Sequence, residues 1–380
     1  MKLKLLECFG GIGACSKALE RLGIDYEIAD YVEIDKYAVK SFNAIHNTNF
    51  EPQDICNWDK DIEVDLIMHG SPCQDFSLAG KQAGGDKNSG TRSSLMYETI
   101  RIVEKLKPKY VIWENVKNLL SKKHRHNFDA YLEIMEQLGY TNYYQVLNAK
   151  DYGIPQNRER VFTVSIRDDS GIRKGAFLGT FYLEDYEANN FEFPPKQKLK
   201  LKLKDMLEDE VDERYYLSNK MIEYISADNE KWTGNNDKSI INKSVASAIN
   251  TGEGSRRCDA SNYISNQVEE NFNLKGSSYL RDFGSKGKLQ NKEYCDTLTA
   301  SMGTGGGNVP IFQNNLRIRK LTPREVWRLM GFDDEDFEKA SKVNSNSQLY
   351  KQAGNSIVVN VLEAILNNLL LDNNEDIIEK

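Results

Sequence analysis

Short apolar segments alternate with helical patterns over residues 3–166, and this alternation constrains the fold more than any other feature. Strands are predicted at 4–9, 26–32, 65–69 and 110–113, and each is followed by a turn or polar residues and then by a helical pattern. Strands that alternate with helices favour a mostly parallel sheet with helices on both faces. The sequence therefore predicts a doubly wound α/β fold, whose ligands bind at the carboxyl ends of the strands.

The first predicted strand leads directly into the glycine turn Gly10–Gly13, and a helical pattern follows from 14 to 22. Glycines at a helix N-terminus let the backbone approach a nucleotide-like ligand. Glu33 follows the second predicted strand about 20 residues later, where a carboxylate can bind ribose hydroxyls. Ser16 stands where the dinucleotide-binding fingerprint has its third glycine or alanine, and this departure disfavours a nicotinamide enzyme.

A rigid thiol is predicted at the end of the third strand, where Gly70-Ser71-Pro72 leads into Cys73. Pro72 has a fixed φ and no N–H donor, so we expect Cys73 on a turn rather than inside a regular element. Most cysteines are small buried hydrophobic residues, but a thiol on a turn at this edge of the sheet can act as a nucleophile. The segment 80–94 is rich in Gly, Ser, Lys and Asn, and its position favours a lid over a disordered connection.

Further reactive groups are predicted at the same edge. Glu114 follows the strand at 110–113, and Asp54 is expected at the end of another strand. Arg158 and Arg160 alternate along a predicted strand, so their side chains should face one way. A carboxyl group in this position can donate a proton, and guanidinium groups can hold a carbonyl oxygen or a phosphate.

Beyond residue 171 the alternation fades, and the segment 171–315 is predicted to form a smaller domain. The stretch Thr297–Gly307 contains a Thr-Leu-Thr sequence and a dense glycine run, which suggests a strand that enters a recognition loop. Thr322 as a cap and Pro323 at the first helical position predict the start of another helix.

Composition limits the class of protein. The net charge of −7 counts against nucleic-acid binding, but 231–320 holds thirteen Lys and Arg against eight Asp and Glu, which is compatible with a local basic surface. The six cysteines lack paired spacing, so neither a disulfide scaffold nor a metal site is predicted. No uninterrupted apolar stretch approaches the ~20 residues that span a bilayer, which favours a soluble cytoplasmic protein without membrane association.

Short motifs follow one another along the chain in a characteristic order: Phe9-x-Gly11-x-Gly13, Glu33, Pro72-Cys73-Gln74, Glu114-Asn115-Val116, Gln156-x-Arg158-x-Arg160, Arg319-x-Leu321-x-Pro323-Arg324-Glu325 and Gly354-Asn355-Ser356. Together they resemble the motif series of the bacterial and phage cytosine-C5 DNA methyltransferases. The resemblance covers about residues 3–166 and 317–367 and leaves the stretch between them as the family's variable target-recognition region. Glu7 and Cys8 depart from it, because the family more often has Asp and an aliphatic residue there.

The resemblance implies an S-adenosylmethionine-dependent methyltransferase fold with a second, smaller target-recognition domain. It also implies methyl transfer from S-adenosylmethionine to C5 of a flipped-out cytosine in double-stranded DNA. Cys73 would bond to cytosine C6 as the nucleophile and Glu114 would protonate N3, while Arg158 and Arg160 would hold O2 and an adjoining phosphate. The implied cofactor-binding residues are Phe9, Gly11, Gly13, Glu33, Asp54, Ile55, Pro72 and Asn355. The implied DNA-binding residues are Gln74, Ser77, Arg92, Thr297 and Thr299.

Residues 1–195 together with 345–380 are predicted to form the catalytic domain, 196–317 the target-recognition domain, and 318–344 a hinge with a supporting helix. We expect a monomer at the nucleoid of a bacterial or phage-infected cell. A companion restriction endonuclease is a candidate partner.

Two alternatives stay open at this point: a tRNA cytosine-C5 methyltransferase of the same family, and a catalytically silent DNA-binding regulator with this fold. The long segment 171–315 favours DNA, because an enzyme for a single tRNA site needs no large base-reading module. Cys73, Glu114, Arg158 and Arg160 disfavour a silent regulator, since binding alone requires none of them.

Overall fold

The structure is a computed structural model that describes residues 2–72, 95–169, 191–216, 218 and 319–371. Elsewhere it describes only the backbone of short strands: β8 (Phe177–Leu178), β9 (Phe181–Tyr182), β10 (Lys243–Ser244), β11 (Asn262–Ser265), β12 (Ser278–Leu280), β13 (Leu289–Lys292), β14 (Cys295–Asp296), β15 (Pro310–Asn314) and the first residues of β16 (Arg317–Lys320).

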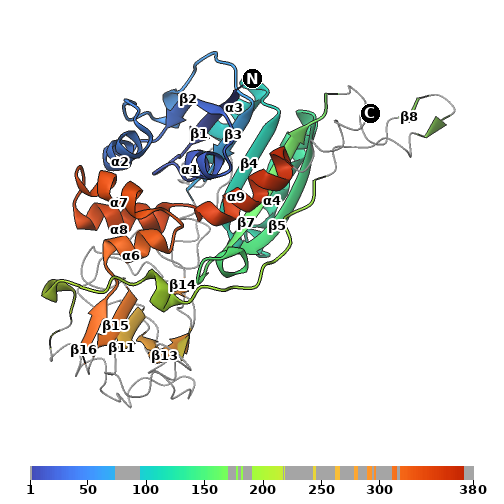
Figure 1. The fold of residues 1–380 in the computed structure, drawn as a ribbon. Coiled ribbons are helices and arrows are strands. Elements are labelled where there is room, and N and C mark those ends of the chain that lie inside the picture. The colour runs from blue at the N-terminus through green and yellow to red at the C-terminus, as the bar shows by residue number, and fades with distance from the viewer. Residues whose placement is uncertain are drawn as a thin grey trace.

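The centre of the molecule is a six-stranded sheet with the order β2-β1-β3-β4-β7-β5 (Figure 1). The first four strands in this order are parallel, whereas β7 is antiparallel to both of its neighbours. This mostly parallel sheet confirms the predicted α/β fold. The strands are β1 (Leu3–Cys8), β2 (Tyr26–Val32), β3 (Leu66–His69), β4 (Tyr110–Val116), β5 (Tyr140–Asn148) and β7 (Glu159–Arg167), with the short β6 (Gln156–Asn157) before β7.

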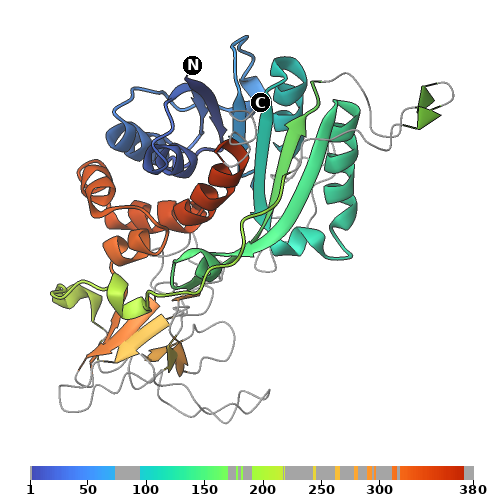
Figure 2. The same ribbon diagram turned by 45° about the vertical axis from the view of Figure 1, so that its right-hand side comes forward.

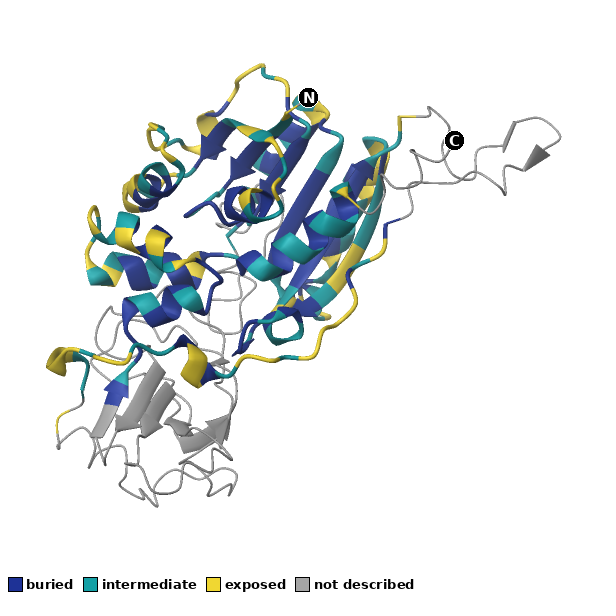
Figure 3. Cartoon of the chain, viewed as in Figure 1, coloured by how far each residue is buried: buried dark blue, intermediate teal, exposed yellow. Residues whose placement is uncertain are grey.

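Helices cover both faces of the sheet. They are α1 (Ala14–Arg21), α2 (Lys36–His46), α3 (Met96–Leu106), α4 (Arg125–Gln137), α6 (Pro323–Arg328), α7 (Asp334–Ser341), α8 (Asn346–Asn355) and α9 (Val359–Leu370). Successive strand residues point to opposite faces: Leu5 and Ile112 pack in the cluster that contains α1 and α9, whereas Leu6 and Val111 pack in the cluster that contains α3 and α4. The inner strands β1, β3, β4 and β7 are therefore largely buried on both sides, whereas the edge strands β2 and β5 also carry exposed residues (Figure 3).

The helices α6 to α9 extend the core on the side of α1 (Figures 1 and 2). The helix α6 begins as predicted: Thr322 caps it, Glu325 completes a capping box, and Pro323 is its first residue. Buried Lys17 of α1 forms ion pairs with Asp333 and Asp336 at 2.9 and 3.1 Å, which joins the start of the chain to α7.

One described segment, 346–370, has the length and hydropathy that a membrane-spanning helix requires, and 56% of its most apolar window is buried. Extended backbone at Ser356 divides it into α8 and α9, and the residues of α9 pack with those of α1 in the core. We therefore interpret the segment as two core helices.

The backbone strands between 243 and 320 form separate small sheets: β10, β13 and β12 pair in one, and β11, β15 and β16 pair in another. The domain limits predicted from the sequence stay a prediction. Leu203 and Met206, which lie beyond the predicted limit at 195, pack in the same core cluster as α1 and α9.

Candidate functional site

The carboxyl ends of four neighbouring strands lie in register. Cys8 pairs with both Val32 and His69, and His69 pairs with Trp113. The next residue of each strand therefore extends one row, which consists of Phe9, Glu33, Gly70 and Glu114. This row crosses β1 and β3. The chain continues from β1 to one edge of the sheet and from β3 to the other, and ligands of folds of this kind bind at such a position.

The turn after β1 has a left-handed backbone at three positions, with φ of 54° at Phe9, 57° at Gly11 and 80° at Gly13. Such a conformation is unusual for phenylalanine and is typical of functional turns. Both peptide groups of Gly11 are hydrogen-bonded. Its N–H donates to Glu33 Oε2 at 3.2 Å, directly after β2, and its carbonyl accepts from the Tyr31 hydroxyl of β2 at 2.6 Å.

His46 of α2 contacts the backbone of this turn. Its Nε2 lies 3.3 Å from the Ile12 carbonyl, and its ring packs against Phe42. Burial lowers the pKa of His46 to about 4, so the ring is neutral at pH 7 and donates its proton to this carbonyl. The space beside Gly13 is filled by these rings, because a Cβ there would lie 2.8 Å from Phe42 and closer still to His46.

The predicted ribose-binding acid is partly buried and fixed in place. Burial raises the pKa of Glu33, while N–H donors from Asp35 and Gly11 oppose that rise. Directly after it, Ile34 is 68% exposed, which is unusual for an isoleucine beside a buried turn. Sequence analysis missed Ile34, although an apolar residue between two acids outside the strand pattern was a signal for it.

The loop with Asp54 and Ile55 joins this row through Gln53, whose N–H donates to the Glu33 carbonyl at 2.8 Å. The prediction that Asp54 ends a strand is wrong: it caps a 3₁₀ turn, accepting from Cys56 N–H at 3.0 Å. An Asp side chain that binds the backbone two residues later favours such turns over strands. Arg101 of α3 also binds this loop. Sequence analysis missed Arg101, because no pattern in the neighbouring residues indicates this contact.

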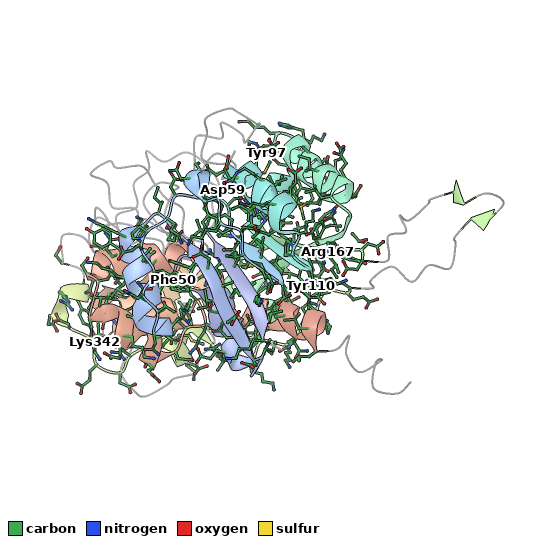
Figure 4. The ribbon with its side chains drawn as sticks, turned by 90° about the horizontal axis from the view of Figure 1, so that it is seen from above. Phe50, Asp59, Tyr97, Tyr110, Arg167 and Lys342 are labelled. Atoms are coloured by element: carbon green, nitrogen blue, oxygen red, sulfur yellow. The ribbon has the colours of Figure 1, made fainter. Side chains whose placement is uncertain are left out.

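Arg101 Nη2 donates to the carbonyls of Ile55 at 3.0 Å and Trp58 at 2.9 Å. One guanidinium therefore binds both ends of the turn after Asp54. Figure 4 shows α3 beside this loop, with Tyr97 and Asp59 labelled.

Glu114 lies at the other end of the row, on β4, and is 9% exposed. Arg160 Nε lies 3.0 Å from Glu114 Oε1, so the two residues form an ion pair. The carboxylate also lies against Gly70, because a Cβ at that glycine would be 3.8 Å from Glu114 Oε2. The structure thus brings the predicted acid, one of the predicted arginines and the start of the turn before Cys73 together.

Arg158 differs from the expectation in two respects. It lies between β6 and β7, so the two arginines do not alternate within one strand, although both border a small cavity together with Glu114. Its buried guanidinium donates from Nη2 to the carbonyls of Ser356 at 2.7 Å and Gly354 at 3.3 Å. These carbonyls flank Asn355, which is exposed. Arg158 therefore fixes the turn that presents Asn355.

Pro72 is partly exposed, and Ser71 before it is buried against β4. The remaining predicted site residues lie outside the described residues: Cys73, Gln74, Ser77, Arg92, Thr297 and Thr299. Their roles stay predictions.

A second hollow lies at the opposite end of the sheet, where Tyr110 and Arg167 are labelled in Figure 4. Lys4, Lys109 and Arg167 line it, but they form ion pairs with Glu63 and Asp169. Since this end holds the amino ends of the parallel strands, we assign it no site.

The chain is similar to known proteins over most of its length. The family model described as C-5 cytosine-specific DNA methylase matches residues 3–370. Type II methyltransferase M2.ScrFI of Lactococcus lactis subsp. cremoris is 33% identical, over 97% of this chain and 99% of that protein. Orphan methyltransferase M.SPRI of Bacillus phage SPR is also 33% identical, over 97% and 98%.

Solved structures show the same fold. A Dnmt2 methyltransferase from S. pombe has a TM-score of 0.60 at 18% identity and covers 98% of this chain and 100% of its own. A DNMT2 mutant from Spodoptera frugiperda has a TM-score of 0.62 at 19% identity, with 97% and 99% covered.

Proposed function

Because the chain belongs to the C-5 cytosine-specific DNA methylase family, we propose that it methylates a flipped-out cytosine through a covalent bond between Cys73 and C6. Its substrate is DNA and its methyl donor is S-adenosylmethionine. The Glu114–Arg160 ion pair beside the turn that leads to Cys73 is the observation that supports the proposal most directly.

The residues after β1 and β2 fit this cofactor. A Cβ at Gly11 would meet no heavy atom within 4 Å, so the turn leaves room for a ligand against its backbone. Glu33 faces the same turn as a ribose acceptor, and exposed Ile34 offers an apolar surface for a flat base. Phe9, Gly13, Asp54, Ile55, Pro72 and Asn355 complete the proposed set. The bound cofactor supplies an electrophilic methyl group.

Each step of the proposed reaction assigns one task to a residue of this chain. The Cys73 thiolate adds to cytosine C6, and Glu114, which must be in its protonated form for this step, donates that proton to N3. Arg160 pairs with Glu114 and holds that carboxyl group, and its guanidinium is proposed to contact O2 of the base. C5 then takes the methyl group, a base removes the C5 proton, N3 returns its proton, and the thiolate leaves. Arg158 acts beside the cofactor end by holding the turn around Asn355.

The target-recognition residues are proposed on the sequence alone. Thr297 and Thr299 would approach base edges, while Gln74, Ser77 and Arg92 would contact DNA around the flipped base. Named relatives include both a type II enzyme and an orphan phage enzyme, so a companion endonuclease is proposed only as a candidate. Bacterial and phage relatives support a cytoplasmic protein, and we propose that it acts as a monomer.

The test compares wild type with Cys73→Ser on duplex DNA that carries 5-fluorocytosine at the target site. Wild type should form an adduct that survives denaturing electrophoresis, because fluorine cannot leave C5 as a proton does. Cys73→Ser should form none and should lose at least about 10³-fold in methyl transfer, while S-adenosylmethionine binding stays within a few-fold.

Transfer near the wild-type rate by Cys73→Ser would refute the covalent mechanism. The same assay with a tRNA transcript tests the alternative substrate, since faster transfer to tRNA than to duplex DNA would overturn the proposal. A silent regulator would bind DNA but transfer no methyl group to either polymer.

A further inference from the structure

We propose that Trp113 is a positioning residue for the nucleophile, because its indole N–H holds Ser71, which precedes Cys73 by two residues. This inference rests on the proposed role of Cys73. Trp113 Nε1 donates to Ser71 Oγ at 3.0 Å, and both residues are buried, with 1% and 3% of their surfaces exposed. Ser71 precedes Cys73 by two residues, with Pro72 between them.

Among the described residues of this turn, Gly70 to Pro72, few other groups are available for a neighbour to bind. Pro72 has no N–H donor, and its fixed φ restricts the direction in which the chain continues from Ser71. Asn115, also on β4, donates from Nδ2 to the Ser71 carbonyl at 3.4 Å and to Ser71 Oγ at 3.5 Å, and both contacts are longer and weaker than the one from Trp113. The hydroxyl of Ser71 therefore accepts the better-formed hydrogen bond, and Trp113 supplies it.

The indole is itself held in place by aromatic packing on the α4 side of the sheet. Its ring is stacked on His69, with an interplanar angle of 2°, and lies 4.2 Å from the ring of Tyr131. Burial lowers the pKa of His69 to about 3, so this layer is uncharged at pH 7. Close packing of this kind leaves a ring little freedom to move, so the donor is preorganised.

Adjacent positions on β4 place Trp113 and Glu114 on opposite faces of the sheet. One strand therefore fixes two parts of the reaction, with the general acid on one face and the hydrogen bond to the nucleophile turn on the other. Because misplacing a reacting group by about 1 Å can reduce the rate by about 10²-fold, loss of this hydrogen bond should slow bond formation without weakening cofactor binding.

Trp113→Phe removes the indole N–H and keeps an aromatic ring. We expect kcat and the rate of adduct formation with 5-fluorocytosine DNA to fall by about 10-fold to 10²-fold. The dissociation constants for S-adenosylmethionine and DNA should stay within about twofold, because the contacts around Phe9 and Glu33 lie elsewhere in the row.

The matched control is Tyr131→Phe, which removes a buried hydroxyl from the same aromatic layer. That hydroxyl contacts His69 Nε2 at 3.2 Å and does not reach Ser71. The control should cost less stability than Trp113→Phe, because it deletes one hydroxyl and leaves no cavity, and it should leave kcat within about twofold. Equal kcat values in Trp113→Phe and Tyr131→Phe would overturn the inference, because the loss would then be structural.

Ser71→Ala provides a second route, since it removes the acceptor while the indole stays. It should reproduce the loss in Trp113→Phe, and the double variant should be no slower than either single variant. If the fold-losses in kcat of the two single variants multiply in the double variant, the two residues do not act through one hydrogen bond and the inference is refuted. The two proposals are separable: an active Cys73→Ser enzyme refutes the covalent mechanism, whereas an inactive Cys73→Ser with normal Trp113→Phe refutes only this inference.

Discussion

Alanine at Gly11 and at Gly13 should have opposite consequences, although both glycines lie in the same turn. Each has a left-handed φ, of 57° and 80°. An L-residue there costs about 1–2 kcal/mol, offset by about 0.4–1 kcal/mol from the less flexible unfolded chain. For Gly11→Ala the net loss of stability is therefore roughly 1 kcal/mol, because its Cβ meets no heavy atom within 4 Å.

Gly13→Ala adds a steric conflict, since its Cβ would lie 2.8 Å from Phe42 and closer to His46. Overpacking of a buried site costs about 1–3 kcal/mol, which brings the total loss to roughly 3 kcal/mol. Urea unfolding of the two variants measures this difference. Adding His46→Ala should offset part of the loss in Gly13→Ala but not in Gly11→Ala, which makes the pair of double variants a control.

Cofactor affinity should be affected in the reverse order, more in Gly11→Ala than in Gly13→Ala. The Gly11 methyl group would project into the space proposed for the cofactor, so calorimetry should find S-adenosylmethionine affinity reduced by at least about 10-fold in Gly11→Ala. Folded Gly13→Ala should bind within a few-fold of wild type, because its methyl group would face Phe42 and His46 and leave the backbone side of the proposed cofactor site open. If Gly13→Ala is no less stable than Gly11→Ala, or if Gly11→Ala binds normally, the assigned geometry of this turn is wrong.

Two further predictions use polar groups beside the site, Glu7 and Arg101. Burial raises the pKa of Glu7 from 4.5 to about 7, so the folded chain binds more protons than the unfolded chain between these values and this residue's contribution to stability falls as pH rises through them. The stability of Glu7→Gln relative to wild type should therefore rise by roughly 3 kcal/mol between pH 4.5 and 8, and a constant difference in urea unfolding would contradict this. Arg101→Gln should raise KM for S-adenosylmethionine by about 10-fold and leave kcat unchanged, because it frees the carbonyls of Ile55 and Trp58. Lys105→Gln, on the same helix, is the control, and an equal rise in both KM values would refute the role of Arg101.

Local patterns predicted the elements whose signals lie within one segment. The strand at 26–32 and the helix that begins at Pro323 match the structure, because apolar residues and cap residues act on neighbouring backbone. Glu33 and Glu114 were proposed as site residues for the same reason, since each directly follows an apolar segment, and their roles stay predictions.

The rest of the site depends on pairings between distant segments. The insertion of β7 between β4 and β5 places Arg160 beside Glu114, and nothing near residue 160 specifies that neighbour. The contacts of Arg101 and of Arg158 join residues 43 or more positions apart. Such contacts are set by the packed fold rather than by local propensity.

The ion pairs and hydrogen bonds between segments far apart along the chain affect the order in which the enzyme folds during synthesis. Lys17 bonds to Asp336, and Arg158 bonds to Ser356, 198 positions along the chain. A ribosome releases the N-terminal half first, and contacts of long sequence separation form slowly. We expect the turn around Asn355 to be fixed only after α7 to α9 have been synthesised. The capacity to modify DNA should therefore arise only late in synthesis.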